Sequence, residues 1–220
     1  MKFTKNEIRK AMLLYAVTDQ MWLKDGERLT DVVETVLQNG ATFLQIREKD
    51  LAQDAFEAET ERLKTLCERH GVPFVVNDSV EIALQCNANG VHVGQSDIKG
   101  RDIRAIIGPD KILGISAGTV EEAVAAENAG ADYIGVGAIF GTSTKKNARS
   151  MTMELLKDIV SSVSIPVVAI GGISAGHILQ LCGSGVDGVA VVSAIFAAED
   201  PGKATAALLP LAKEVVAAHG

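Results

Sequence analysis

A short polar loop at residues 141–145 combines residue types that bind anions. Its sequence, Gly-Thr-Ser-Thr-Lys, offers the hydroxyls of Thr142 and Thr144, backbone N–H groups and the ammonium group of Lys145. Hydroxyls, N–H groups and a cation within one short span suit a phosphate group. The loop follows an apolar stretch that begins at Tyr133 and is typical of a buried strand. The sequence therefore predicts an anion-binding loop at the carboxyl end of a strand.

Gln45, Arg47 and Lys49 form a second group that could bind an anion. They alternate along the chain, so they point to one side of an extended segment. Two cations and an amide on one side make a clamp for anionic oxygens. The alternative is a solvated strand end, in which the cations pair with Glu48 or Asp50.

Asp78 and Asp97 each follow one of two consecutive apolar runs, and Asn77 lies directly before Asp78. Neighbouring parallel strands lie roughly 5 Å apart, so carboxylates at their ends can converge. A carboxylate pair beside phosphate oxygens is a usual arrangement for holding Mg²⁺. The alternative is that each aspartate caps the helix that follows it, because Asp is a preferred N-cap residue. The two roles can also coexist.

Three further positions lie where apolar runs end. Ser116 could donate a hydrogen bond to an anion or face solvent. The pairs Gly171-Gly172 and Val192-Ser193 end the last two runs, whose loops often bind phosphate in barrel proteins through backbone N–H groups. The alternative for the glycine pair is a tight turn without a ligand.

The elements that must position these residues are short apolar runs alternating with helical patterns. We expect strands over residues 13–17, 43–46, 74–76, 90–93, 111–115, 133–137, 166–170 and 188–192. We expect helices over residues 29–37, 52–69, 80–86, 98–107, 119–128, 153–160, 175–181 and 203–217.

Strand–helix repetition along the whole chain predicts a (β/α)8 TIM barrel, an α/β fold. Residues 1–220 are expected to form a single domain, with the first dozen residues capping the barrel floor. The strands lack polar alternation, which fits a parallel sheet covered on both faces. An open doubly wound sheet is the alternative, but no GxGxxG follows the first strand. In a barrel, all the polar strand ends listed above face one cleft.

Composition restricts the class of protein and of partner. The net charge is −7 and there is no basic block, which argues against a nucleic-acid partner. No apolar run is long enough to span a bilayer, and the start lacks a secretory signal. Cys67, Cys86 and Cys182 show no CxxC spacing and are interpreted as buried thiols of a reducing compartment. We therefore expect a cytoplasmic protein with small-molecule partners and no membrane partner. The oligomeric state stays open, a homodimer included.

His92 lies in the middle of an apolar run, between Val91 and Val93. We interpret it as a histidine satisfied by hydrogen bonds inside the barrel in preference to a catalytic base.

A set of short segments spans nearly all of the chain: residues 15–19 (YAVTD), 45–49 (QIREK), 76–78 (VND), 90–95 (GVHVGQ) with Asp97, 114–116 (GIS), 131–137 (ADYIGVG), 142–145 (TSTK), 168–173 (VAIGGI) and 188–193 (GVAVVS). In these segments and in their order, the chain resembles the thiamine-phosphate synthase family. As a set these segments are specific, although each alone is not.

The resemblance implies a transferase of thiamine biosynthesis that joins 4-amino-5-hydroxymethyl-2-methylpyrimidine diphosphate to 4-methyl-5-(2-phosphoethyl)thiazole and releases diphosphate. It implies a dissociative mechanism, in which diphosphate leaves first and the thiazole nitrogen captures a pyrimidinylmethyl cation. The residues implied for the pyrimidine diphosphate are Gln45, Arg47, Lys49, Asn77, Ser116 and Lys145, of which Arg47, Lys49, Ser116 and Lys145 would act in catalysis. Asp78 and Asp97 would bind Mg²⁺ as the cofactor. The residues implied for the thiazole phosphate are Thr142, Thr144, Gly172, Val192 and Ser193.

The chain departs from the family pattern at Gly118, where the family usually has His, and at Ala138 and Gly141, where prolines are common. We expect these departures to alter loop mobility and to leave the chemistry intact. Two other hypotheses are a related thiazole tautomerase and a non-catalytic sensor of a phosphate ligand. The intact basic and carboxylate sets favour the synthase, because a tautomerase has no diphosphate to hold.

Overall fold

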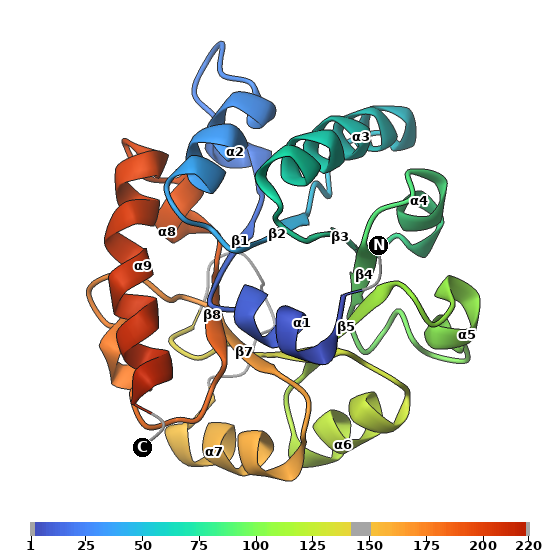
Figure 1. Cartoon of the computed structure of the whole chain (residues 1–220), viewed down its shortest axis with the longest axis vertical. Coiled ribbons are helices and arrows are strands. Elements are labelled where there is room, and N and C mark those ends of the chain that lie inside the picture. Colours follow the sequence, from blue (N-terminus) through green and yellow to red (C-terminus); the bar gives the residue numbers. More distant parts are fainter. Residues whose placement is uncertain (1–2, 142–150, 219–220) are drawn as a thin grey trace.

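Eight parallel strands close into a barrel in the computed structural model, which describes residues 3–141 and 151–218 (Figure 1). The strands are β1 (Leu14–Val17), β2 (Phe43–Ile46), β3 (Phe74–Asn77), β4 (Gly90–Val93), β5 (Ile112–Ala117), β6 (Tyr133–Val136), β7 (Val167–Ile170) and β8 (Gly188–Val191). Strand β1 pairs with both β2 and β8, which closes the sheet. The predicted (β/α)8 barrel is therefore confirmed, and the alternative of an open sheet is wrong.

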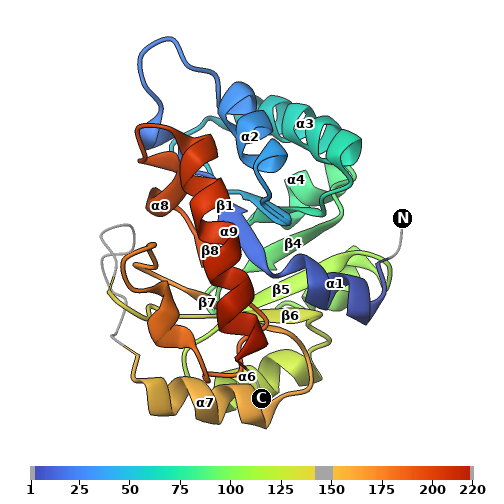
Figure 2. The same ribbon diagram turned by 60° about the vertical axis from the view of Figure 1, so that its left-hand side comes forward.

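Helices surround the sheet on its outer face, and α9 runs along the outside of the barrel against β8 and β1 (Figure 2). The helical segments are α1 (Lys5–Ala11), η1 (Gln20–Trp22), α2 (Leu29–Gln38), α3 (Gln53–His70), α4 (Val80–Gln85), α5 (Ile103–Ile107), α6 (Val120–Asn128), α7 (Met153–Ser162), η2 (Ile178–Leu181), α8 (Ser193–Phe196) and α9 (Pro201–Ala217). Within the described ranges, no helix has the length and apolar character that crossing a membrane requires.

Two helix predictions need correction, and one short helix was not expected. The helix expected over residues 98–107 begins only at Ile103, because the Asp102 side chain accepts from the Ala105 N–H and caps α5 there. The helix expected over 175–181 is the short 3-10 segment η2. Helix α8 was not predicted, since four residues are too few to show a helical period.

One cysteine prediction is also corrected. Cys67 and Cys86 are buried as expected, whereas Cys182, just after η2, is exposed.

Alternation of side chains along each strand separates two apolar cores. Leu14, Leu44 and Val76 point outward to the helices and belong to the larger core. Tyr15 and Val75 belong to the second core, inside the barrel. Towards the carboxyl ends the inward positions become polar or lose their side chain: Gln45, Asn77, His92, Ser116 and Gly135. The barrel interior is therefore packed at one end and hollow at the other.

Helix α1 lies across the centre of the barrel in Figure 1. Its residue Ile8 and the following Met12 are buried in the inner core with Tyr15. Thr4 and Glu7 form a capping box that fixes the start of α1. The amino-terminal segment therefore packs against the filled end of the barrel, opposite the strand ends that carry polar residues.

Gly90 provides a test of the barrel packing. A Cβ atom at this position would lie 2.0 Å from the backbone oxygen of Ile112 on the neighbouring strand. We predict that Gly90→Ala lowers the free energy of unfolding by about 1–3 kcal/mol, because backbone in a closed sheet cannot move aside freely. Urea denaturation measures the change.

The matched control is Gly176→Ala, where the nearest atom to the added Cβ would be the Ser174 hydroxyl at 3.8 Å. A Gly90 variant as stable as this control would contradict the packing described for β4 and β5.

Candidate active site

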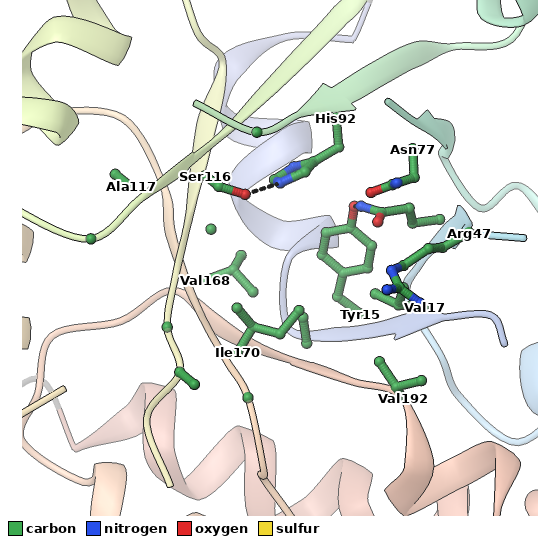
Figure 3. Close-up of a pocket in the computed structure, with 18 of the residues that line it drawn as sticks. Tyr15, Val17, Arg47, Asn77, His92, Ser116, Ala117, Val168, Ile170 and Val192 are labelled. Atoms are coloured by element: carbon green, nitrogen blue, oxygen red, sulfur yellow. Dashed lines mark hydrogen bonds between the residues drawn. The ribbon is translucent and has the colours of Figure 1, made fainter. Parts of the chain in front are cut away.

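A cavity of about 860 Å³ opens at the carboxyl ends of the strands, and every strand contributes to its lining. All the expected site residues that the structure describes line it: Gln45, Arg47, Lys49, Asn77, Asp78, Asp97, Ser116, Gly171, Gly172, Val192 and Ser193. Thr142, Thr144 and Lys145 lie outside the described residues. In Figure 3, Arg47 and Asn77 lie on one side of the cavity and Ser116 lies on another. The structure thus brings together residues that are far apart in the sequence.

The cationic side of the cavity carries Arg47 and Lys49 after β2. Arg47 pairs with Asp19 after β1, with 3.6 Å between guanidinium nitrogen and carboxylate oxygen. The alternative drawn from the sequence, in which Arg47 pairs with Glu48 or Asp50, is therefore wrong: among the described residues its ion pair is with Asp19. Its backbone N–H donates to the Thr18 hydroxyl at 3.0 Å, which fixes the strand end.

Glu48 turns away from the cavity and joins the ends of β1 and β2. Its carboxylate is buried and accepts from the Thr18 hydroxyl at 2.6 Å and from the Gln20 N–H at 3.0 Å. Burial raises the pKa of Glu48, and these two hydrogen bonds oppose the rise. Because Thr18 also accepts from the Arg47 N–H, Glu48 supports the backbone that carries Arg47.

Asp78 and Asp97 form an acidic pair on the same cavity wall. Burial raises the pKa of Asp78, the nearby charge of Asp97 raises it further, and Lys49 opposes both. The backbone holds Asp78 in a left-handed conformation, with φ of 62°, and its N–H donates to the His92 carbonyl at 2.8 Å. The Asp97 carboxylate accepts from the Gly94 N–H at 2.8 Å. The two carboxylates thus repel each other from positions fixed by backbone contacts.

Neither aspartate is a helix cap, so that alternative is wrong for both. Ser79 caps α4, since its hydroxyl accepts from the Ile82 N–H. Asp102 caps α5.

The acidic pair has the chemistry to hold a divalent metal ion. Carboxylate oxygens are the ligands that Mg²⁺ prefers, and two neighbouring carboxylates would be stabilised by a cation between them. Within residues 3–141 and 151–218 no group of three or more His, Cys, Asp or Glu side chains is placed to bind a metal. A magnesium ion here would take its remaining ligands from substrate oxygens and water, as is usual for this ion.

A chain of hydrogen bonds crosses the base of the cavity from β2 to β5. The Gln45 amide nitrogen donates to the Tyr15 hydroxyl at 2.6 Å, and the hydroxyls of Tyr15 and Tyr133 are 2.8 Å apart. His92 contacts Tyr133 through Nδ1 at 2.9 Å and Ser116 through Nε2 at 3.0 Å, the contact drawn in Figure 3. Burial raises the pKa of both tyrosines, so they stay protonated. His92 therefore has a partner on each ring nitrogen, as the sequence interpretation expected.

The loops after β6 and β7 approach each other closely at the glycine pair. Gly171 and Gly172 have φ of 102° and 69°, and a Cβ atom on Gly172 would lie 2.0 Å from the Gly141 carbonyl oxygen. The Phe140 N–H donates to the Gly171 carbonyl at 3.0 Å. Tight backbone contact alone explains these glycines, and the same contact places them on the cavity wall.

Sequence reasoning did not find several residues that shape the cavity. Gln95 donates from its side chain to the Ser116 carbonyl at 2.7 Å, and Glu122 accepts from the Gly118 N–H at 2.7 Å. Tyr15 and Tyr133 were counted as apolar strand residues. Tyr133 could have been recognised by parity, because it faces the same side of its strand as Gly135, which lines the cavity nearer the carboxyl end. Tyr15 offered no such signal, because the matching position in its strand is Val17.

Comparison with known proteins assigns the chain to a family. The family model for thiamine monophosphate synthase matches residues 14–195, which is most of the chain. The chain belongs to the thiamine monophosphate synthase family. Thiamine-phosphate synthase of Ruminiclostridium cellulolyticum is 49% identical over 187 residues, covering 85% of this chain and 89% of that protein. That of Clostridioides difficile is 47% identical, covering 90% and 94% of the two chains.

A solved structure agrees with the sequence relatives. Thiamine phosphate pyrophosphorylase from Pyrococcus furiosus superposes with a TM-score of 0.86 at 38% identity, covering 94% of this chain and 98% of that one. The family is thus shown by its sequence model, by curated relatives and by an experimental fold, and the relatives named above are transferases of thiamine biosynthesis.

The role given to Glu48 can be tested by stability. We predict that Glu48→Ala lowers the free energy of unfolding by about 1–3 kcal/mol, because the Thr18 hydroxyl and the Gln20 N–H lose their buried acceptor. Thermal unfolding followed by circular dichroism gives the difference.

Glu27→Ala is the control. Glu27 lies in the loop after β1, which also contains Gln20, and it accepts from the Lys24 N–H, but its side chain is exposed. This variant should change stability by less than about 0.5 kcal/mol. Equal effects of the two substitutions would show that Glu48 does not support the strand ends.

Proposed function

We propose that the cavity catalyses the coupling of 4-amino-5-hydroxymethyl-2-methylpyrimidine diphosphate to 4-methyl-5-(2-phosphoethyl)thiazole, giving thiamine phosphate and diphosphate. The observation that carries the proposal is the convergence of Arg47 and Lys49 with the Asp78–Asp97 pair in one cavity at the strand ends. Cations and a carboxylate pair side by side suit a ligand with a diphosphate group together with Mg²⁺. The partners are thus small molecules, and we retain the expected cytoplasmic location as part of the proposal.

The diphosphate of the first substrate would lie against the cationic side. Arg47 and Lys49 would donate to its oxygens, with Asn77 beside them, and Lys145, which follows β6 in the sequence, would add a further cation. Asp78 and Asp97 would hold Mg²⁺, which neutralises negative charge on the leaving diphosphate. Gln45 and Ser116, on the deeper wall, would orient the pyrimidine diphosphate.

The second substrate would bind at the loops after β7 and β8. Gly171 and Gly172 bring backbone close to the cavity without side chains, and Val192 and Ser193 lie at the next strand end. Thr142 and Thr144 from the preceding loop complete the group proposed for the thiazole phosphate. This arrangement keeps the phosphate of one substrate apart from the diphosphate of the other.

The chemistry needs charge stabilisation and exclusion of water more than a nucleophilic side chain. The carbon–oxygen bond to diphosphate breaks with its electron pair leaving on oxygen, and the thiazole nitrogen lone pair then forms the new carbon–nitrogen bond. Arg47 and Lys49 would stabilise the charge that develops on the leaving group. Val168 and Ile170 give the cavity an apolar side that would shield the pyrimidinylmethyl cation from water (Figure 3).

The function is tested by incubating the protein with both substrates and Mg²⁺ and measuring thiamine phosphate and diphosphate by chromatography. We expect equal amounts of the two products and none when either substrate is omitted. A folded protein that forms neither product would overturn the proposed function. Conversion of a thiazole substrate alone would point instead to the related tautomerase.

Arg47 is predicted to act on the leaving group. Arg47→Ala should lower kcat by about 10²–10³-fold, as expected when a donor to developing negative charge is removed. Steady-state kinetics measure the loss, and Lys145→Ala should behave similarly. Arg62→Ala is the control, because Arg62 is exposed on α3 and pairs with Glu59. An Arg47 variant with the same turnover as this control would show that Arg47 does not stabilise the leaving group.

Magnesium dependence is predicted to require the acidic pair. The double substitution Asp78→Asn with Asp97→Asn should abolish turnover or its dependence on Mg²⁺, because amides are weaker ligands than carboxylates. Calorimetric titration with Mg²⁺ and inorganic diphosphate gives a second readout that does not need turnover. Asp158→Asn, at an exposed site on α7, serves as the control. Mg²⁺-dependent turnover at the wild-type rate in the double variant would refute the metal assignment.

A further inference from the structure

The hydrogen-bonded chain beneath the cavity has a direction that can be worked out from its donors. It links Gln45, Tyr15, Tyr133, His92 and Ser116 through four contacts of 2.6 to 3.0 Å. The first and last members are residues proposed above to touch substrate, and the three between them have no role in the reaction so far.

The direction is set at Gln45, whose amide nitrogen faces the Tyr15 oxygen. Tyr15 accepts there, so its single hydroxyl hydrogen is available for Tyr133. Tyr133 in turn accepts from Tyr15 and donates its own hydrogen to Nδ1 of His92. A neutral histidine that accepts at Nδ1 carries its hydrogen on Nε2 and donates it to the Ser116 hydroxyl oxygen.

Other assignments with this Gln45 orientation leave a buried hydroxyl hydrogen without an acceptor. If Nδ1 of His92 carried a hydrogen, Tyr133 would accept from His92 and from Tyr15, and its own hydrogen would lack a partner among the contacts described. An unmade hydrogen bond at a buried group is costly, and Tyr133 has no exposed surface. The neutral Nε2–H form of His92 is therefore the one that satisfies the whole chain.

The alignment of three strands allows the contact between His92 and Tyr133 at the centre of the hydrogen-bonded chain. His92, Gly114 and Tyr133 are level with one another on β4, β5 and β6. A Cβ atom on Gly114 would lie 2.2 Å from the Tyr133 ring and 2.5 Å from Nδ1 of His92. The missing side chain at Gly114 lets the two rings meet across the strand between them, while Gly135 lies level with Ser116 and next to the His92 ring.

We propose that Tyr133 and His92 are positioning residues that present Ser116 to the substrate as a hydrogen-bond donor. Since the Ser116 oxygen accepts from His92, its own hydrogen is directed to another acceptor, and the cavity is the side on which Ser116 is accessible. The pyrimidine diphosphate carries acceptors on its ring nitrogens and its diphosphate oxygens. The inference rests on the proposed function for its substrate, but the hydrogen-bond direction itself does not.

The direction is tested without substrate by NMR of protein labelled with ¹⁵N in histidine. The protein has four histidines, and the variant His92→Gln identifies the His92 signals by their loss. Two-bond ¹H–¹⁵N correlations should show the neutral Nε2–H form in the wild type. Tyr133→Phe should yield a mixture of tautomers, because Nδ1 loses its donor.

Tyr15→Phe is the matched control, since it removes a buried hydroxyl from the same chain but leaves the Tyr133 hydrogen for His92. Its His92 should keep the Nε2–H form. The Nδ1–H form in the wild type would reverse every bond of the chain and overturn the proposal. A tautomer unchanged in Tyr133→Phe would do the same. If Tyr133→Phe does not fold, the wild-type and Tyr15→Phe spectra still decide.

Kinetics test whether the chain acts through Ser116. Tyr133→Phe should lower kcat/KM for the pyrimidine diphosphate about tenfold and leave KM for the thiazole phosphate unchanged. In a Ser116→Ala background the same substitution should cause no further loss, because the hydroxyl it orients is absent. A full tenfold loss in both backgrounds would show a merely structural role. A wild type without synthase activity would defeat the proposed function, while the NMR result on the hydrogen-bond direction would stand.

Discussion

Closure of the parallel sheet is the constraint on which the rest of the structure depends. Because β1 pairs with both β2 and β8 in parallel, all eight strands end at the same rim. Alternation along each strand then decides which side chains face the interior at that rim. Asn77 is paired in register with His92, and Ser116 with Gly135. Polar side chains or a glycine therefore occupy the inward positions beyond the packed apolar layers of the interior. The cavity is a direct result of this register.

The cavity holds charged side chains that are partly buried and close to one another, unlike charges on a solvated surface. Asp78 is drawn partly out of water next to Asp97, which raises its pKa, and Lys49 offsets only part of that effect. Such an arrangement costs folding free energy without a ligand, and a cation with a diphosphate would relieve it. Glu48 contributes from behind, since its buried carboxylate holds the loop after β1 to the strand that carries Arg47.

The strands and the shared rim could be predicted because buried parallel strands are continuous apolar runs that end in polar residues. The start of α5 could not, because Ile98 fits the helical period while Asp102 captures the Ala105 N–H and begins the helix later. The same limit applied to the aspartates, whose position before a helical pattern suggested caps that Ser79 and Asp102 provide instead. The chain from Gln45 to Ser116 depends on which rings meet across Gly114, and a linear sequence does not display that contact.

The central claim is that one rim of the barrel binds the diphosphate between its cations and its acidic pair. A crystal structure with thiamine phosphate, diphosphate and Mg²⁺ tests it most directly. The account predicts diphosphate oxygens within hydrogen-bond distance of Arg47 and Lys49, with the metal ion between them and the carboxylates of Asp78 and Asp97. Diphosphate bound elsewhere, or a metal ion that neither aspartate contacts, would contradict it.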